Sequence, residues 1–208
     1  MASIINASST GAGGIIQTAD ASGVLQLQSN GVTALSTSGA NVTIAGTLTT
    51  ASQSIAKASL PTGSVLQVVN GSYNLEVSTA LNALVDTNLT ASITPLFSTS
   101  KILCIVNMCG VAKAAGNTQT NLGFYLLRGA STIIQFEYTA CYTNTSLELR
   151  GGSVSTTYLD SPATTSSTTY KVQFNSNGGT GTGYVQKASS GTGGSTSTST
   201  ITLMEIAA

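Results

Sequence analysis

The chain has 208 residues, of which 41% are hydrophobic and only 7% are charged, and its seven Lys and Arg balance seven Asp and Glu. Ordinary soluble domains carry about 25% charged residues. A nucleic-acid partner needs a basic face that neutralises phosphates, and this charge balance excludes one. A surface without net charge also gives a free monomer little protection against self-association. The composition therefore indicates a protein that works as an assembly, with a weakly charged soluble monomer as the alternative.

The composition also removes most routes to catalysis. The chain has no His, the usual general base near neutral pH and the commonest metal ligand. Its three cysteines, Cys104, Cys109 and Cys141, are odd in number and form no CxxC pair, which argues against a disulfide framework and against a zinc site. We expect no catalytic residues, no metal site and no cofactor.

Two patterns keep a catalytic alternative open. Ser54–Lys57 and Ser98–Lys101 match S-x-x-K, but such matches arise by chance in a chain rich in Ser and Thr. Glu137 and Glu148 are the nearest candidates for the paired carboxylates of a glycosidase. Nothing in the sequence brings these two glutamates together, so a sugar hydrolase is a remote alternative.

The sequence shows no targeting or membrane segment. It begins MASIINASSTGAGG, without a basic n-region or a long apolar stretch. Its longest apolar runs fall far short of the about 18 residues that span a membrane. We expect synthesis in a reducing cytoplasm and no membrane insertion.

Residues 1–50 predict an anchoring arm followed by a small β stalk. Val24–Gln28 alternates apolar and polar residues, and Asn30–Gly31 separates it from a second β-prone run. Asn-Gly between two such runs is the strongest short hairpin signal, because both residues tolerate positive φ. Asn41–Leu48 repeats the alternation.

Each of these short segments has only one narrow apolar face, and two or three such strands cannot stand alone. We expect the face to pack against neighbouring copies of the chain, and a loose linker is the alternative. The residues expected in this oligomerisation or docking surface are Ile15, Ile16, Val24, Leu25, Leu27, Val42, Ile44 and Leu48.

Residues 51–59 predict a linker, and residues 60–208 predict a β-sandwich, jelly-roll-like head. Short runs rich in Val, Ile and Leu alternate with turn residues, without helical periods between them. Asn70–Gly71 predicts a tight turn, and the apolar run Ile102–Val106 predicts a central strand buried on both faces. The expected strands are Val65–Val69, Tyr73–Val77, Leu81–Asp86, Thr90–Thr94, Ile102–Cys109, Leu122–Arg128, Thr132–Tyr138, Val154–Leu159, Thr169–Phe174, Gly183–Lys187 and Ile201–Ile206.

The polar connections supply candidate receptor contacts. Ala114–Thr120 and Asn175–Gly183 are expected to be loops at the ends of the sandwich. Tyr at the tip of a β loop can stack on sugars or fill a protein interface, although Tyr beside a strand end is more often a core-edge residue. The candidates for receptor contact are Asn117, Gln119, Tyr142, Tyr158 and Tyr184.

Several segments of the sequence resemble segments of tailed-phage proteins. ASGVLQLQSNGVTALSTSGANVTIAGTL resembles the short β stalks of fibre and virion proteins, especially of phages that infect cyanobacteria and marine bacteria. SIAKASLPTGSVLQVVNGSYN, LTASITPLFSTSKILCIV, GFYLLRGASTII, TTYKVQFNS and ITLMEI resemble the C-terminal β domain of such proteins. The resemblance implies a homotrimer with a jelly-roll-like tip on the tail or capsid surface, and it implies no catalytic residues.

The chain departs from long fibres because only about fifty residues precede the head, which limits an extended stalk to roughly 165 Å. This favours a short tail fibre or tail appendage that attaches to other tail or capsid proteins by its N-terminus and presents the head to a host-surface glycan or protein. A capsid cement or decoration protein is the alternative.

Overall fold

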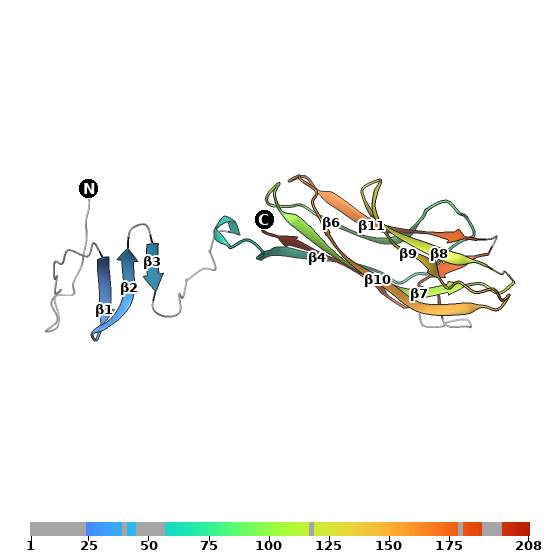
Figure 1. The fold of residues 1–208 in the computed structure, drawn as a ribbon, viewed down its shortest axis with the longest axis horizontal. Coiled ribbons are helices and arrows are strands. Elements are labelled where there is room, and N and C mark those ends of the chain that lie inside the picture. The colour runs from blue at the N-terminus through green and yellow to red at the C-terminus, as the bar shows by residue number, and fades with distance from the viewer. Residues whose placement is uncertain (1–23, 39–40, 45–56, 117–118, 179–180, 189–196) are drawn as a thin grey trace. The chain divides into compact units, whose positions relative to one another are not determined.

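The computed structural model describes residues 24–38, 41–44, 57–116, 119–178, 181–188 and 197–208 (Figure 1). These residues form thirteen β-strands and one 3-10 turn, which confirms the all-β prediction. No helix among them is long and apolar enough to cross a membrane. The chain divides into two compact units, Met1–Ser54 and Ile55–Ala208, and the second is called the head below. Four residues of the predicted surfaces lie outside the described residues: Ile15, Ile16, Leu48 and Asn117.

The first unit contains an antiparallel sheet, the N-terminal sheet, of β1 (Val24–Ser29), β2 (Val32–Ser38) and β3 (Asn41–Ile44), in that order. Asn30 and Gly31 connect β1 to β2 with φ angles of 51° and 75°. Positive φ at both central residues is what a two-residue hairpin turn requires. The predicted hairpin is therefore confirmed.

The head contains ten strands after a 3-10 turn, η1 (Lys57–Ser59). They are β4 (Val65–Tyr73), β5 (Val77–Thr79), β6 (Val85–Ile93), β7 (Lys101–Lys113), β8 (Asn121–Arg128), β9 (Ser131–Ala140), β10 (Leu149–Asp160), β11 (Thr168–Asn177), β12 (Gly183–Val185) and β13 (Ser199–Ile206).

Eight of these strands form two antiparallel sheets, β4-β13-β7-β10 and β6-β11-β8-β9. Successive strands mostly alternate between the sheets, and β8-β9 is the hairpin that stays within one. This order is that of a jelly roll, two Greek keys folded into a sandwich. The short strands β12 and β5 extend the first sheet beside the last residues of β7.

The core lies between the two sheets and follows the two-residue period of a strand. In β6 the burial alternates, so that Thr87, Leu89, Ala91 and Ile93 face inward. Inward-facing side chains of β7, β8, β11 and β13 make up most of the rest of the core: Ile102, Cys104, Val106, Met108, Leu122, Phe124, Leu126, Tyr170, Val172, Phe174, Ile201 and Leu203.

Several sequence predictions for the head were wrong in detail. The strand expected at Tyr73–Val77 does not form, because Tyr73 ends β4 and Val77 begins β5. Asn70–Gly71 is not a turn, because β4 runs straight through it and pairs with β13. A Cβ atom at Gly71 would collide with the carbonyl oxygen of Thr90, so glycine here permits a close approach of β6. The strand expected to begin at Leu81 begins at Val85. Residues 175–177, expected in a loop, are buried at the end of β11.

The prediction that Ile102–Val106 is buried on both faces was also wrong, because a single chain buries only one face of this run. Ile102, Cys104 and Val106 are fully buried against the second sheet. Leu103 and Ile105 point to the opposite face, where Leu103 is half-buried and Ile105 is exposed. The chain therefore covers only one side of its most apolar strand.

The head has two distinct ends. The chain enters beside its own C-terminus, because the N–H of Gly63 donates to the carbonyl of Ala207 (2.8 Å) and the N–H of Ala207 donates to Ser64 (2.9 Å) (Figure 1). The connections that follow β4, β7, β9, β11 and β12 lie at the opposite end of the strands, called the loop end below.

Candidate functional site

The loop end is held together by hydrogen bonds between connections that are distant in sequence. After β7, the N–H of Ala114 donates to the carbonyl of Thr182 (2.8 Å), and the N–H of Gln119 donates to Thr143 (2.9 Å). The buried Lys113 donates from Nζ to the carbonyl of Thr145 (2.7 Å). Three loops thereby form one surface.

The structure brings three of the predicted receptor residues to this end. Gln119 and Tyr142 are exposed in adjoining connections, and Tyr184 lies in β12. Tyr158 does not join them, because it lies within β10 and packs against the core. Leu147, which the sequence did not single out, is the most exposed of the large hydrophobic side chains here, at 70%.

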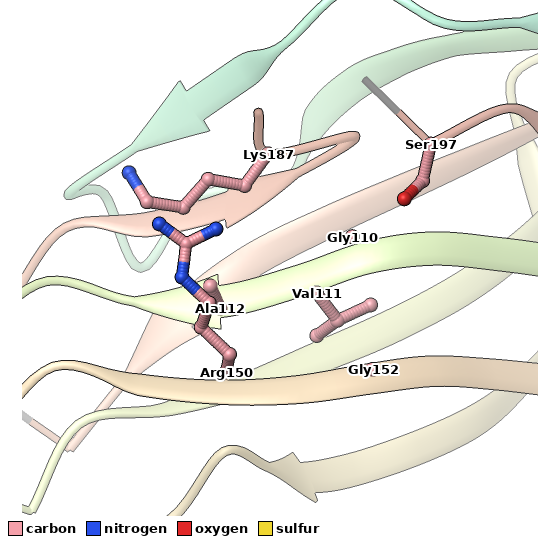
Figure 2. A pocket seen from close by; sticks show the side chains of 7 residues that line it. All are labelled: Gly110, Val111, Ala112, Arg150, Gly152, Lys187 and Ser197. Carbon is pink, nitrogen blue, oxygen red and sulfur yellow. The ribbon is translucent and has the colours of Figure 1, made fainter. Parts of the chain in front are cut away.

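An open hollow of about 240 Å³ lies beside these loops on β7 and β10 (Figure 2). It is lined by Gly110, Val111, Ala112, Arg150, Gly152, Lys187 and Ser197. Figure 2 shows the Arg150 and Lys187 side chains on one side of the hollow, with Ser197 across from them. The sequence did not reveal this pair, because only the pairing of β10 and β12 along β7 brings it together.

Both cations of the hollow have partners within the chain. Arg150 Nε lies 2.8 Å from Glu148 Oε1, and its guanidinium donates to the carbonyl of Ala188 (2.7 Å). Lys187 Nζ lies 3.4 Å from the centroid of the Tyr184 ring, a cation–π contact. The site can offer donors to a polar or anionic group, but its charge is partly neutralised already.

The two candidate carboxylates of a hydrolase are each engaged locally. Glu137 Oε1 accepts hydrogen bonds from the N–H groups of Thr139 (2.7 Å) and Tyr138 (2.8 Å), and these outweigh partial burial and lower the pKa of Glu137. A glycosidase acid needs a raised pKa. Glu148 is paired with Arg150. Within the described residues, no group of three or more His, Cys, Asp or Glu is placed to hold a metal ion.

The three cysteines are free thiols. Burial raises the pKa of Cys104 to about 12, and the nearby charge of Asp160 adds to this effect. Burial likewise raises the pKa of Cys141. Since the thiolate is the reactive form, both residues behave as core residues.

The N-terminal sheet has one apolar and one polar face. The strand register places Leu27, Leu35 and Ile44 in one row and Leu25, Thr37 and Val42 in the next. Leu27 and Val42 are 57% and 61% exposed. Val24, predicted to share this face, is half-buried on the other side of the sheet, because side chains alternate along β1 and Val24 falls on the same side as Gln26. On the other face, the hydroxyl of Thr33 donates to Gln26 (3.3 Å) and the amide of Gln28 donates to Thr33 (3.5 Å).

Comparison with known proteins shows no family for this chain. No protein-family model matches the sequence, and no curated protein is detectably similar to it. Among solved structures, the infectious bursal disease virus VP2 subviral particle is similar over 69% of this chain, with 11% identity and a TM-score of 0.35. This match spans 34% of the VP2 chain. A likeness of this size carries no conclusion about function.

Proposed function

We propose that this protein is a non-enzymatic structural component of a tailed-phage particle, most specifically a short tail fibre or tail appendage. Its N-terminal part attaches to other tail or capsid proteins, and its head binds a glycan or protein on the host surface. It is made in the host cytoplasm and works as a homotrimer, without a cofactor, nucleic acid or membrane insertion. The resemblance of its sequence to phage stalk and head segments supports this role.

The observation that carries the proposal is that the chain enters the head at one end and the exposed loops lie at the other. The chain enters at one end, beside Ala207, and the connections carrying Gln119, Tyr142 and Leu147 lie at the other. A rigid sandwich that presents loops away from its point of attachment is the common arrangement of recognition domains. Tyr142 and Leu147 are exposed at 55% and 70%, so both are available for contact.

The N-terminal sheet supplies the attachment and assembly function in this proposal. Its exposed apolar face, with Leu27 and Val42, is suited to packing against other chains. A single layer of three short strands leaves its apolar face uncovered, and copies of the same face provide the missing layer. This unit is the point at which the protein is joined to itself and to the particle.

Capsid decoration is the second candidate function, and the size of the hollow favours it. Ligand pockets usually enclose about 300–1,000 Å³ and bury most of their ligand. The hollow at Arg150 and Lys187 is smaller, about 240 Å³, and open. A decoration protein needs no receptor groove, because its largest contact is with capsid subunits.

Electron microscopy of intact particles tests the choice between these functions. A fibre predicts copies at the tail with their loop ends pointing outward, and decoration predicts copies spread over the capsid lattice. Absence of the protein from the particle would contradict both.

Phage adsorption tests the receptor role separately. Replacing Tyr142 and Leu147 by Ser removes the exposed apolar contacts of the loop end and should slow adsorption at least about tenfold. Thr165→Ser, an exposed position at the other end of the head, is the matched control and should leave adsorption unchanged. Normal adsorption by the loop variant would argue for the decoration role.

A further inference from the structure

An apolar belt crosses the outer face of the β4-β13-β7-β10 sheet. The register aligns Val68, Met204, Leu103 and Leu159 in one row that reaches from edge to edge. Ile206 and Ile105 flank this row on β13 and β7. The edge residues Val68 and Leu159 are 55% and 53% exposed. None of the six residues belongs to the core or packs against it.

We propose that this apolar belt is the surface through which the heads of neighbouring copies of this chain pack against one another. The inference rests on the assembly proposed above and adds to it a defined contact in the head. Four arguments favour another copy of this chain as the occupant.

The first argument comes from β7. A continuous apolar run such as Ile102–Val106 is typical of a strand covered on both faces. The chain itself covers only the side of Ile102, Cys104 and Val106. The sequence thus carries the pattern of a strand whose second face is covered in its working state.

The second argument is charge. Lys101 is the one charged residue that the register places in these rows, and its Nζ donates to the hydroxyl of Ser161 (2.9 Å). The neighbouring row is neutral and internally bonded, with Asn70 donating to Thr202 (2.9 Å). A strongly charged partner would find only Lys101 to pair with, whereas two copies of this face each bring a single like charge, at one end of the belt.

The third argument is size. Three rows across four strands correspond to about 400 Å² of sheet surface. A stable interface uses roughly 800 Å² from each partner. The belt therefore suits a contact that is reinforced elsewhere in the same chain, and the N-terminal sheet exposes the second apolar face.

The fourth argument is position. The belt lies toward the end of the head at which the chain enters, since Ile206 pairs with Val65 at the start of β4. Copies joined through residues 24–44 hold their heads at a high effective concentration, which strengthens a weak second contact. A self-contact here also leaves the loop end free.

The test measures the oligomeric mass of the full chain by light scattering over a dilution series. Val68→Asp and Leu159→Asp each place a charge in the belt at a position exposed in the monomer, so folding should be retained. Each should weaken association about 100-fold. Thr132→Asp, exposed on edge strand β9 of the other sheet, is the matched control and should leave the mass unchanged.

Leu27→Asp separates this inference from the proposed assembly. If it lowers the mass while the two belt variants do not, the N-terminal contact stands and the belt contact is overturned. A wild-type chain that stays monomeric at every concentration overturns the belt contact as well, whereas the location on the particle is decided independently by microscopy.

Oxidation of the unaltered protein provides a second measurement that needs no variant. Met204 is half-buried on the belt, and Met108 is fully buried in the core. If heads pack through the belt, peroxide should oxidise Met204 about tenfold more slowly in the assembly than after dilution, while Met108 stays protected in both. Equal rates for Met204 would overturn the inference.

Discussion

The two sheets of the head share one core, but the outer face of β6 and β11 differs in character from the outer face of the opposite sheet. On β6 and β11, Lys171 pairs with Asp86 (2.9 Å), Gln173 donates to the same carboxylate (2.8 Å), and Ser92 bonds Thr169 (2.7 Å). On the other sheet the corresponding surface is the apolar belt. The inner faces of both sheets line the common core, so folding of the chain accounts for both.

The difference shows which face is adapted to water. Partial burial alone would raise the pKa of Asp86, but the hydrogen bonds from Lys171 and Gln173 and the charge of Lys171 outweigh it and lower the pKa. A face that organises such a network is suited to solvent. A face that aligns apolar residues over four strands is suited to another protein surface.

The largest expected effect is a loss of stability on truncating a core residue of β7, compared with truncating its neighbour on the outer face. Ile102→Ala leaves a cavity in the core and should lower the free energy of unfolding by about 2–5 kcal/mol at any protein concentration. Leu103→Ala should have a smaller effect in dilute protein and a larger one when the chain associates. Chemical denaturation at low and high protein concentration measures both. Equal, concentration-independent losses would show that the outer face of β7 is not a contact.

The next effect concerns Glu205, a carboxylate buried under the belt. Glu205 points inward between Met204 and Ile206 and accepts hydrogen bonds from the N–H of Leu96 (2.7 Å) and the amide of Gln67. Burial alone would raise the pKa of Glu205, but hydrogen bonds from Gln67 and from the backbone N–H groups of Leu96 and Phe97 outweigh it and lower the pKa.

A lowered pKa fixes the sign of the pH dependence. The stabilisation by Glu205 is fully present above the unfolded value of 4.5 and is lost as the pH falls through the lower folded value. Glu205→Gln should reduce stability by about 1.5–3 kcal/mol at pH 7 and show a smaller further loss in acid than the wild type. Thermal unfolding between pH 7 and pH 3 measures the difference. Parallel curves would mean that other carboxylates cause the acid sensitivity.

The sequence predicted the architecture because alternation and turn chemistry are local. The contrast between two Asn-Gly pairs shows the limit of such reasoning. Asn30–Gly31 forms the predicted turn, whereas Asn70–Gly71 continues a strand because Gly71 makes room for the carbonyl of Thr90. That contact joins β4 to β6 across the two sheets, and no local pattern encodes it.

The candidate surfaces were predictable to different degrees. The exposed loop residues Gln119 and Tyr142 follow from polar stretches between strands. The belt does not, because Val68, Leu103, Leu159 and Met204 align only through the order and register of four strands. The apolar run Ile102–Val106 of β7 did predict that both faces of this strand are covered. It did not indicate which surface covers the second face.

The smallest expected effects come from replacing one lysine by methionine on the outer face of each sheet. Lys171→Met removes an exposed ion pair, which is worth about 0.2–1 kcal/mol and is screened by salt. Stability should fall slightly in low salt, the difference should shrink in 1 M NaCl, and association should not change. Lys101→Met instead extends the belt beside Ile206 and should tighten association, as light scattering would show. If both substitutions changed association alike, the two outer faces would not differ in function, because added apolar surface on either one would then be enough to bring copies together.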